Sequence, residues 1–182
     1  HTLEDDAAQH LGLHVSSAGF RLFMRRLYDP QRGKGLLMKP GEEPLRLRGE
    51  AGELMEAGEI FFDKVRQFAA DYEDSVIRLR KPDFVLDLLS EKIGHFEHHL
   101  NEYIKGREDN EKDDLDQELS AMLMRCEYYR TAISDFISMR LEDHVYWIEK
   151  GMRKDMNIQM YAAPLNVNEI LRKVLFNGSL PV

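Results

Sequence analysis

Two groups of basic side chains have the residue types and spacing that phosphate binding requires. Arginine presents a planar fork of N–H donors that fits two phosphate oxygens at once, and lysine adds a compact positive charge. The chain as a whole carries a net charge of −8, which does not point to nucleic acid, so any such contact must rest on local groups. The first group consists of Arg21, Arg25, Arg26, Arg32 and Lys34, with Lys39 close behind, and the second of Arg78, Arg80 and Lys81.

We interpret the first group as a candidate contact for a DNA backbone. Arg21 and Arg25 are four residues apart, which places them on one side of a helix. Arg32 and Lys34 follow in a glycine-rich loop, and glycine allows the backbone to come close to a ligand. The alternative for both basic groups is an ordinary solvated surface whose charge is balanced by nearby Asp and Glu.

One helix face and one thiol are the candidates for metal binding or nucleophilic chemistry. Glu91, His95, His99 and Glu102 recur at helical spacing, and two histidines at i and i+4 can share one metal ion. A solvated helix face explains the same pattern, and we expect no metal site here. Cys126 is the single cysteine, so it forms no internal disulfide and cannot hold an iron–sulfur cluster by itself. Its place in an apolar stripe predicts a buried core residue.

The sequence contains no complete catalytic motif. The stretch Gly33-Lys34-Gly35 lacks the upstream glycine and the following Ser or Thr that a phosphate-binding P-loop needs. Neither the G-x-S-x-G elbow of hydrolases nor the H-E-x-x-H pair of metalloproteases occurs. We therefore expect no complete active site within these residues.

The composition is that of a globular helical protein. Hydrophobic residues make up 43% and charged residues 32% of the 182 positions, which argues against disorder. No apolar run is long enough to cross a bilayer, and no signal peptide is recognisable at the start. We expect a soluble, cytoplasmic protein, and because the first residue is His1 rather than Met we interpret the chain as a processed or excised piece.

Apolar periodicity predicts three long helices that would position these side chains. They cover about residues 50–73, Asp83 to Gly106, and about 109–141. The third has a 4-3-4-3 spacing typical of a coiled-coil seam, and three such helices joined by short breaks pack as an antiparallel bundle. Shorter helices are expected over residues 3–11 and after a cap at Ser16 or Ser17, and residues 75–80 should be extended. The seam residues are Leu115, Leu119, Met122, Cys126, Tyr129, Ile133 and Phe136.

The pattern changes after Asp143. Val145 to Ile148 form a strand-like cluster, and residues 156–162 alternate between apolar and polar side chains, which indicates a half-buried strand. A last short helix is expected to begin at Val167 or Asn168. The predicted fold is therefore mainly α: an antiparallel bundle of long helices with a small C-terminal β-hairpin and helix flank that does not belong to the bundle.

Both ends of the chain resemble one family of nucleic-acid motors. The opening His1-Thr2-Leu3-Glu4-Asp5-Asp6-Ala7-Ala8 is similar to the residues that follow motif II, the DEAH box, in DinG/XPD-like superfamily 2 DNA helicases. Three further stretches resemble the segment just before motif III in that family: Val145–Glu149, Ala162–Val167 and Leu171–Phe176. The end of the chain, Leu180-Pro181-Val182, resembles the strand that leads into motif III. The helical middle matches mainly in length and periodicity.

This resemblance implies an Arch-type insertion, the helical domain that helps to enclose single-stranded DNA in these helicases. Residues 1–15 would be a motor-domain flank after the DEAH box, residues 16–143 the helical Arch-type domain, and residues 144–182 a β-hairpin plus helix leading to motif III. His1 would be the last residue of a truncated DEAH box, catalytic in the parent and not functional alone. No cofactor is expected in the fragment. The parent would use ATP and Mg²⁺, and the sequence leaves open whether it carries an iron–sulfur cluster.

The expected role is that of a non-catalytic part of an ATP-hydrolysing 5′–3′ DNA helicase that guides or clamps single-stranded DNA during unwinding. Its partners would be single-stranded DNA and the rest of the helicase motor, with no membrane contact. Two other interpretations stay open. One is a helical-bundle module that docks partner proteins and has no nucleic-acid role, and the other is a stand-alone metal-binding bundle.

Overall fold

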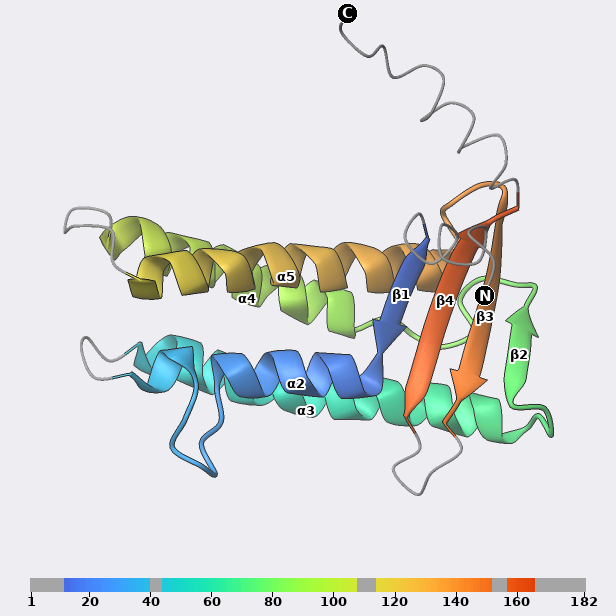
Figure 1. Ribbon diagram of the computed structural model, residues 1–182, viewed down its shortest axis with the longest axis horizontal. Coiled ribbons are helices and arrows are strands. Elements are labelled where there is room, and N and C mark those ends of the chain that lie inside the picture. The colour runs from blue at the N-terminus through green and yellow to red at the C-terminus, as the bar shows by residue number, and fades with distance from the viewer. Residues whose placement is uncertain (1–11, 40–43, 108–113, 152–156, 166–182) are drawn as a thin grey trace, which may run out of the picture.

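A helical bundle with a small antiparallel sheet across one end makes up the protein in the computed structural model (Figure 1). The structure describes residues 12–39, 44–107, 114–151 and 157–165. In Figure 1, α2 and α3 lie together on one side of the bundle and α4 and α5 on the other, with successive long helices running in opposite directions. The elements are β1 (Leu13–Ser16), α2 (Ser17–Leu27), η1 (Leu36–Met38), α3 (Leu45–Ala70), β2 (Val76–Leu79), α4 (Leu89–Arg107), α5 (Asp114–Ser138), β3 (His144–Lys150) and β4 (Ile158–Pro164).

The start of α2 confirms the expected cap, and the start of α3 differs from the expected one. The Ser16 hydroxyl accepts the Gly19 N–H at 3.0 Å and caps α2, as serine does at helix starts. Helix α3 begins at Leu45, ahead of the expected start near Glu50, and runs through Gly49. A glycine within a helix costs only about 1 kcal/mol, and burial of Leu47 outweighs that cost.

The start of α4 corrects the prediction that Asp83 is its cap. Asp83 has a left-handed φ of 57°, and its N–H donates to the Ile137 carbonyl at 2.8 Å. Asp87 caps the helix instead, because its Oδ1 accepts the Ser90 N–H at 2.9 Å. Residues 83–88 therefore form an irregular segment held at both ends, and the helix begins only at Leu89.

The third long helix, α5, carries the expected apolar row, called here the α5 seam. Its buried members pack against the other helices and the sheet in one hydrophobic core. Leu115, at the first turn, is only partly buried against that core. The α5 seam consists of Leu119, Met122, Cys126, Tyr129, Ile133 and Phe136, all at most 5% exposed.

The sheet contains the predicted hairpin and two further strands. Strands β3 and β4 pair antiparallel, as expected, and β2 lies within the segment predicted to be extended. The strand order is β1-β4-β3-β2, so β2 and the unexpected β1 flank the hairpin. The prediction that the hairpin stands apart from the bundle is wrong. Ile77, Ile148 and Met160 of the sheet are buried in the same core as the helices. Apolar burial on the inner sheet face joins the two parts.

The first and last described segments lie side by side. Strand β1 pairs with β4, with Leu13 opposite Ala162, and both stand at the sheet end of the bundle (Figure 1). The helices expected over residues 3–11 and from Val167 or Asn168 lie outside the described residues. None of the described helices combines the length and apolar character that a bilayer crossing requires.

Candidate nucleic-acid interface

Arg21, expected to face DNA, is tied to a carboxylate of the neighbouring helix. Its Nε donates to Glu59 Oε1 at 2.8 Å and its Nη2 to Oε2 at 3.1 Å, which joins α2 to α3. The hydrogen bond from Arg21 lowers the pKa of Glu59, with burial acting in the opposite direction and the charges of Arg21, Arg66 and Arg25 adding to the lowering. Arg21 therefore serves mainly as an interhelical clamp.

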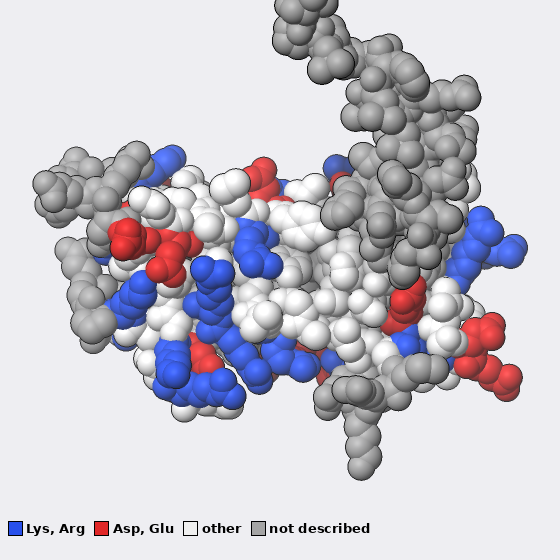
Figure 2. Space-filling view, viewed as in Figure 1, with Lys and Arg blue, Asp and Glu red and all other residues white. Residues whose placement is uncertain are grey.

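Arg25 and Arg26 are the free cations of α2. Both lie in the last turn of the helix, where positive charge stabilises the helix dipole, and both are exposed. Within the described part of the chain, neither forms an ion pair. Lys and Arg side chains gather over α2 and the loop that follows it (Figure 2), so a basic surface exists there.

The loop after α2 is a short, hydrogen-bonded hairpin turn that presents Arg32 and Lys34. Asp29 and Lys34 exchange two backbone hydrogen bonds, at 2.7 and 3.0 Å, and Gly33 takes a left-handed φ of 61° between them. Asp29 Oδ1 also accepts the Arg32 N–H at 3.3 Å, and Asp29 Oδ2 lies 3.9 Å from the Arg32 guanidinium. Asp29 therefore offsets part of the charge of Arg32, whereas Lys34 is exposed.

Gly35 fixes this turn against the end of α2. Its φ is 112°, and a side chain there would meet the Leu27 carbonyl oxygen at 2.8 Å. Only glycine fits both conditions without strain. The close approach keeps the turn beside Arg25 and Arg26 at the end of the helix.

The second basic group lies at the other end of the bundle, on the sheet. Arg78 is exposed on β2, between the inward-facing Ile77 and Leu79, and Arg80 and Lys81 follow in exposed positions. β2 is an edge strand of the sheet. Figure 2 shows a separate basic group at this end of the molecule, so the two groups do not form one continuous site.

An aromatic row crosses the outer face of the sheet and ends beside Arg78. His14, Tyr161 and Trp147 lie opposite one another on β1, β4 and β3, and Arg78 is the next partner on β2. The His14 and Tyr161 rings stack with centroids 4.4 Å apart and planes 8° apart, and the Tyr161 and Trp147 rings with centroids 5.1 Å apart and planes 13° apart. We call His14, Tyr161 and Trp147 the aromatic row.

Hydrogen bonds along the strands hold two members of the aromatic row, Trp147 and Tyr161. Trp147 Nε1 donates to Glu149 at 2.9 Å, and the Tyr161 hydroxyl donates to Gln159 at 3.0 Å. Burial raises the pKa of Tyr161, and the charge of Glu149 raises it further, so the hydroxyl stays protonated and able to donate. The Trp147 and Tyr161 rings are therefore fixed in place, with their polar groups satisfied by neighbours on the same strands.

The sequence predicted the two hairpin strands, β3 and β4, but not the aromatic row that crosses them. Alternation over residues 156–162 placed Tyr161 on the polar side of its strand, and Trp147 stood in the strand-like cluster. Their meeting depends on the register of β3 with β4, and that of His14 on a strand that was not expected. The sequence signal that could have revealed the aromatic row was a large aromatic residue in each of the two hairpin strands, Trp147 and Tyr161.

The histidine face of α4 takes part in an ion-pair network. His99 Nδ1 lies 2.9 Å from Glu50 Oε2, and Arg46 Nη2 lies 2.7 Å from His99 Nε2. The His99 ring therefore lies between the guanidinium of Arg46 and the carboxylate of Glu50 and links α4 to α3. The described residues contain no group of three or more His, Cys, Asp or Glu side chains that could hold a metal ion.

Two further candidates from the sequence are Cys126 and His1. Cys126 is fully buried, as expected for a core residue. Burial raises the pKa of its thiol to about 12, with a further contribution from the charge of Glu97, so the reactive thiolate is not formed near neutral pH. His1 lies outside the described residues.

Comparison with known proteins gives no family assignment. No protein-family model matches the sequence, and no curated protein is significantly similar to it. Any assignment of function therefore rests on the sequence motifs and on the arrangement of the side chains.

Proposed function

We propose that this chain is the Arch-type part of a DinG/XPD-like DNA helicase and that it contacts single-stranded DNA during ATP-driven unwinding. The motif resemblance at both ends supports this assignment. The adjacency of β1 and β4 is what an insertion requires when the chain leaves a motor domain and returns to it. The parent would supply the rest of the DEAH box that ends at His1, together with ATP, Mg²⁺ and any iron–sulfur cluster.

The observation that carries the DNA contact is the aromatic row ending beside Arg78. Proteins that bind single strands without sequence preference combine rings on which bases stack with cations that follow the backbone. The inner rings cover one another, but His14 is exposed on the edge strand β1. A base can therefore extend the stack at His14, on one edge of the sheet, while Arg78, with Arg80 and Lys81 beyond it on the opposite edge, meets phosphates further along the DNA strand.

The basic surface on α2 is a secondary contact in this proposal. Arg25, Arg26, Arg32 and Lys34 supply positive charge for the backbone, whereas Arg21 is occupied by Glu59. Each phosphate neutralised on a single strand adds about 0.7 to the slope of log affinity against log salt. We expect weak binding without sequence preference, because the net charge of −8 opposes it.

The test measures the binding of a fluorescein-labelled oligothymidine to the chain by fluorescence anisotropy at several salt concentrations. Arg78→Glu should weaken binding and flatten the salt dependence. Lys105→Glu is the matched control, since Lys105 is exposed on α4 and belongs to neither basic group. Equal affinities for the wild type and Arg78→Glu would contradict the proposed sheet contact.

A further inference from the structure

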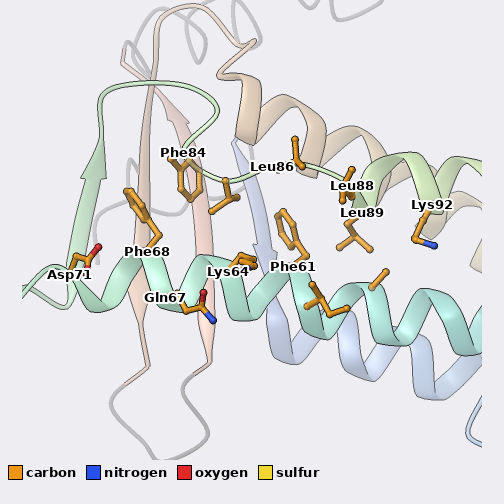
Figure 3. A pocket seen from close by; sticks show the side chains of 13 residues that line it. Phe61, Lys64, Gln67, Phe68, Asp71, Phe84, Leu86, Leu88, Leu89 and Lys92 are labelled. Carbon is orange, nitrogen blue, oxygen red and sulfur yellow. The ribbon is translucent and has the colours of Figure 1, made fainter.

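An apolar groove lies open between α3 and the segment that leads into α4. Its volume is about 630 Å³. Three of its large apolar side chains are strongly exposed: Leu86 at 76%, Leu88 at 57% and Ile60 at 54%. Such concentrated exposure is uncommon on a soluble surface and marks a site of interaction. Its lining includes Lys64 and Phe68 of α3, Phe84, Leu86 and Leu88 of the segment before α4, and Lys92 of α4 (Figure 3).

The groove is pre-formed, because its irregular wall is anchored on both sides of Leu86. Asp83 is bonded to the carbonyl of Ile137, and Asp87 caps α4. Between them, Phe84 packs against Phe68 of α3 with ring centroids 4.7 Å apart. These contacts fix the wall in place at the edge of α3, and Leu86 and Leu88 stay exposed beside it.

The charges around the groove select the chemistry of its occupant. Lys64 on α3 and Lys92 on α4 both line it, and neither forms an ion pair among the residues that the structure describes. The one acidic lining residue, Asp71, lies at the opposite end from Lys92 (Figure 3). A partner with carboxylates beside an apolar stripe would pair with both lysines.

We propose that this groove docks an amphipathic, acidic helix of a partner protein. The α3 wall runs from Ala57 to Asp71, about 21 Å at 1.5 Å per residue, which matches about four turns of a guest helix. Helices bind such grooves with apolar side chains at i, i+3, i+4 and i+7. This docking is independent of the DNA contact proposed for the sheet.

The direct test uses a designed, fluorescein-labelled peptide of about four helical turns. It carries leucine on one stripe and glutamate on both flanks. A second peptide has the same composition with the leucines scattered around the helix, and a third replaces every glutamate by lysine. Anisotropy with the intact chain should show saturable binding of the first peptide and at least tenfold weaker binding of the other two.

Variants of the chain locate the binding. Leu86→Ser with Leu88→Ser should weaken binding of the acidic peptide at least tenfold while leaving the fold intact, because both side chains are exposed. Leu22→Ser is the matched control, since Leu22 is 71% exposed on α2. Lys64→Glu with Lys92→Glu should reverse the preference from the acidic to the basic peptide.

Three results would overturn this inference. The first is equal binding of the striped and scattered peptides, or no binding of either. The second is self-association of the wild-type chain that Leu86→Ser with Leu88→Ser abolishes, which would make a second copy the occupant. The third is displacement of the peptide by oligothymidine, which would assign the groove to nucleic acid. Arg78→Glu should leave peptide binding unchanged, because Arg78 does not line the groove. Peptide binding and DNA binding can therefore fail independently of each other.

Discussion

The α5 seam and the aromatic row are both regular rows of side chains, but the fold uses them differently. The α5 seam runs along one helix and is buried on every side by other elements. The aromatic row crosses separate strands, and its rings contact one another on the sheet face turned away from the core. A row buried on all sides contributes only to stability, whereas a row with an open end is available to a ligand. The two rows should therefore respond to substitution in opposite ways.

Leu119→Ala should give the largest effect on stability. Leu119 is 1% exposed in the α5 seam, and such a truncation costs about 2–5 kcal/mol through lost burial and the cavity left behind. Urea unfolding followed by circular dichroism measures the loss. The folded fraction should bind oligothymidine as the wild type does. A loss below about 0.5 kcal/mol, the range of ordinary surface substitutions, would show that the seam is not packed.

Gly35→Ala should come next, with a stability loss of about 1–3 kcal/mol from backbone strain. The reasons are its φ of 112° and the approach to the Leu27 carbonyl. Gly49→Ala is the matched control, because nothing lies within 4 Å of the added Cβ and alanine favours a helix by about 1 kcal/mol. Thermal unfolding should therefore shift in opposite directions for the two variants, and shifts of the same sign would contradict the assigned turn geometry.

His14→Ala should weaken oligothymidine binding by about 1–3 kcal/mol, the usual contribution of one stacked base. Its effect on unfolding should be smaller, about 0.2–1 kcal/mol, since one cross-strand ring pair is lost. His98→Ala serves as the control, because the His98 side chain is 65% exposed on α4 and lies outside the aromatic row. If both histidine variants bind DNA equally well, the open end of the row is not a contact.

Arg21→Ala should give the smallest effect, about 0.2–1 kcal/mol of stability, because exposed ion pairs are screened by solvent. The folded-state pKa of Glu59 lies below its ordinary value of 4.5. The contribution of the pair is therefore present above about pH 4.5 and disappears as the pH falls through the lower folded-state value. Urea titrations at pH 7 and at pH 3 should show the difference between wild type and variant shrinking at the lower pH. Oligothymidine affinity should change less than it does with Arg25→Ala.

Local patterns in the sequence predicted the long helices, the hairpin and most of the core, but not strand β1. The 4-3-4-3 spacing identified the α5 seam, and period-2 alternation identified the hairpin, because each signal comes from consecutive residues on one element. The start of α4 was missed because Asp83 and Asp87 are equally good caps in sequence. The choice between them depends on the Ile137 carbonyl, which is brought in from the end of α5.

The candidate site depends on contacts between distant residues, which local patterns do not contain. Arg21 and Glu59 are 38 residues apart, so helical spacing within α2 could not show that this arginine is paired. The aromatic row likewise depends on strand register across β1, β4 and β3. Sequence identified the basic groups, and tertiary structure determines which of their members are free.

Ultraviolet crosslinking of oligothymidine to the chain tests the central claim most directly, because zero-length crosslinks form only where bases touch side chains. Mass spectrometry of the digested adduct should find the crosslinked base on His14, at the open end of the aromatic row. Arg78→Glu should reduce the yield, whereas Lys105→Glu should not. Crosslinks confined to α2 and the turn over residues 29–34, or a yield unaffected by Arg78→Glu, would contradict a DNA contact on the outer face of the sheet.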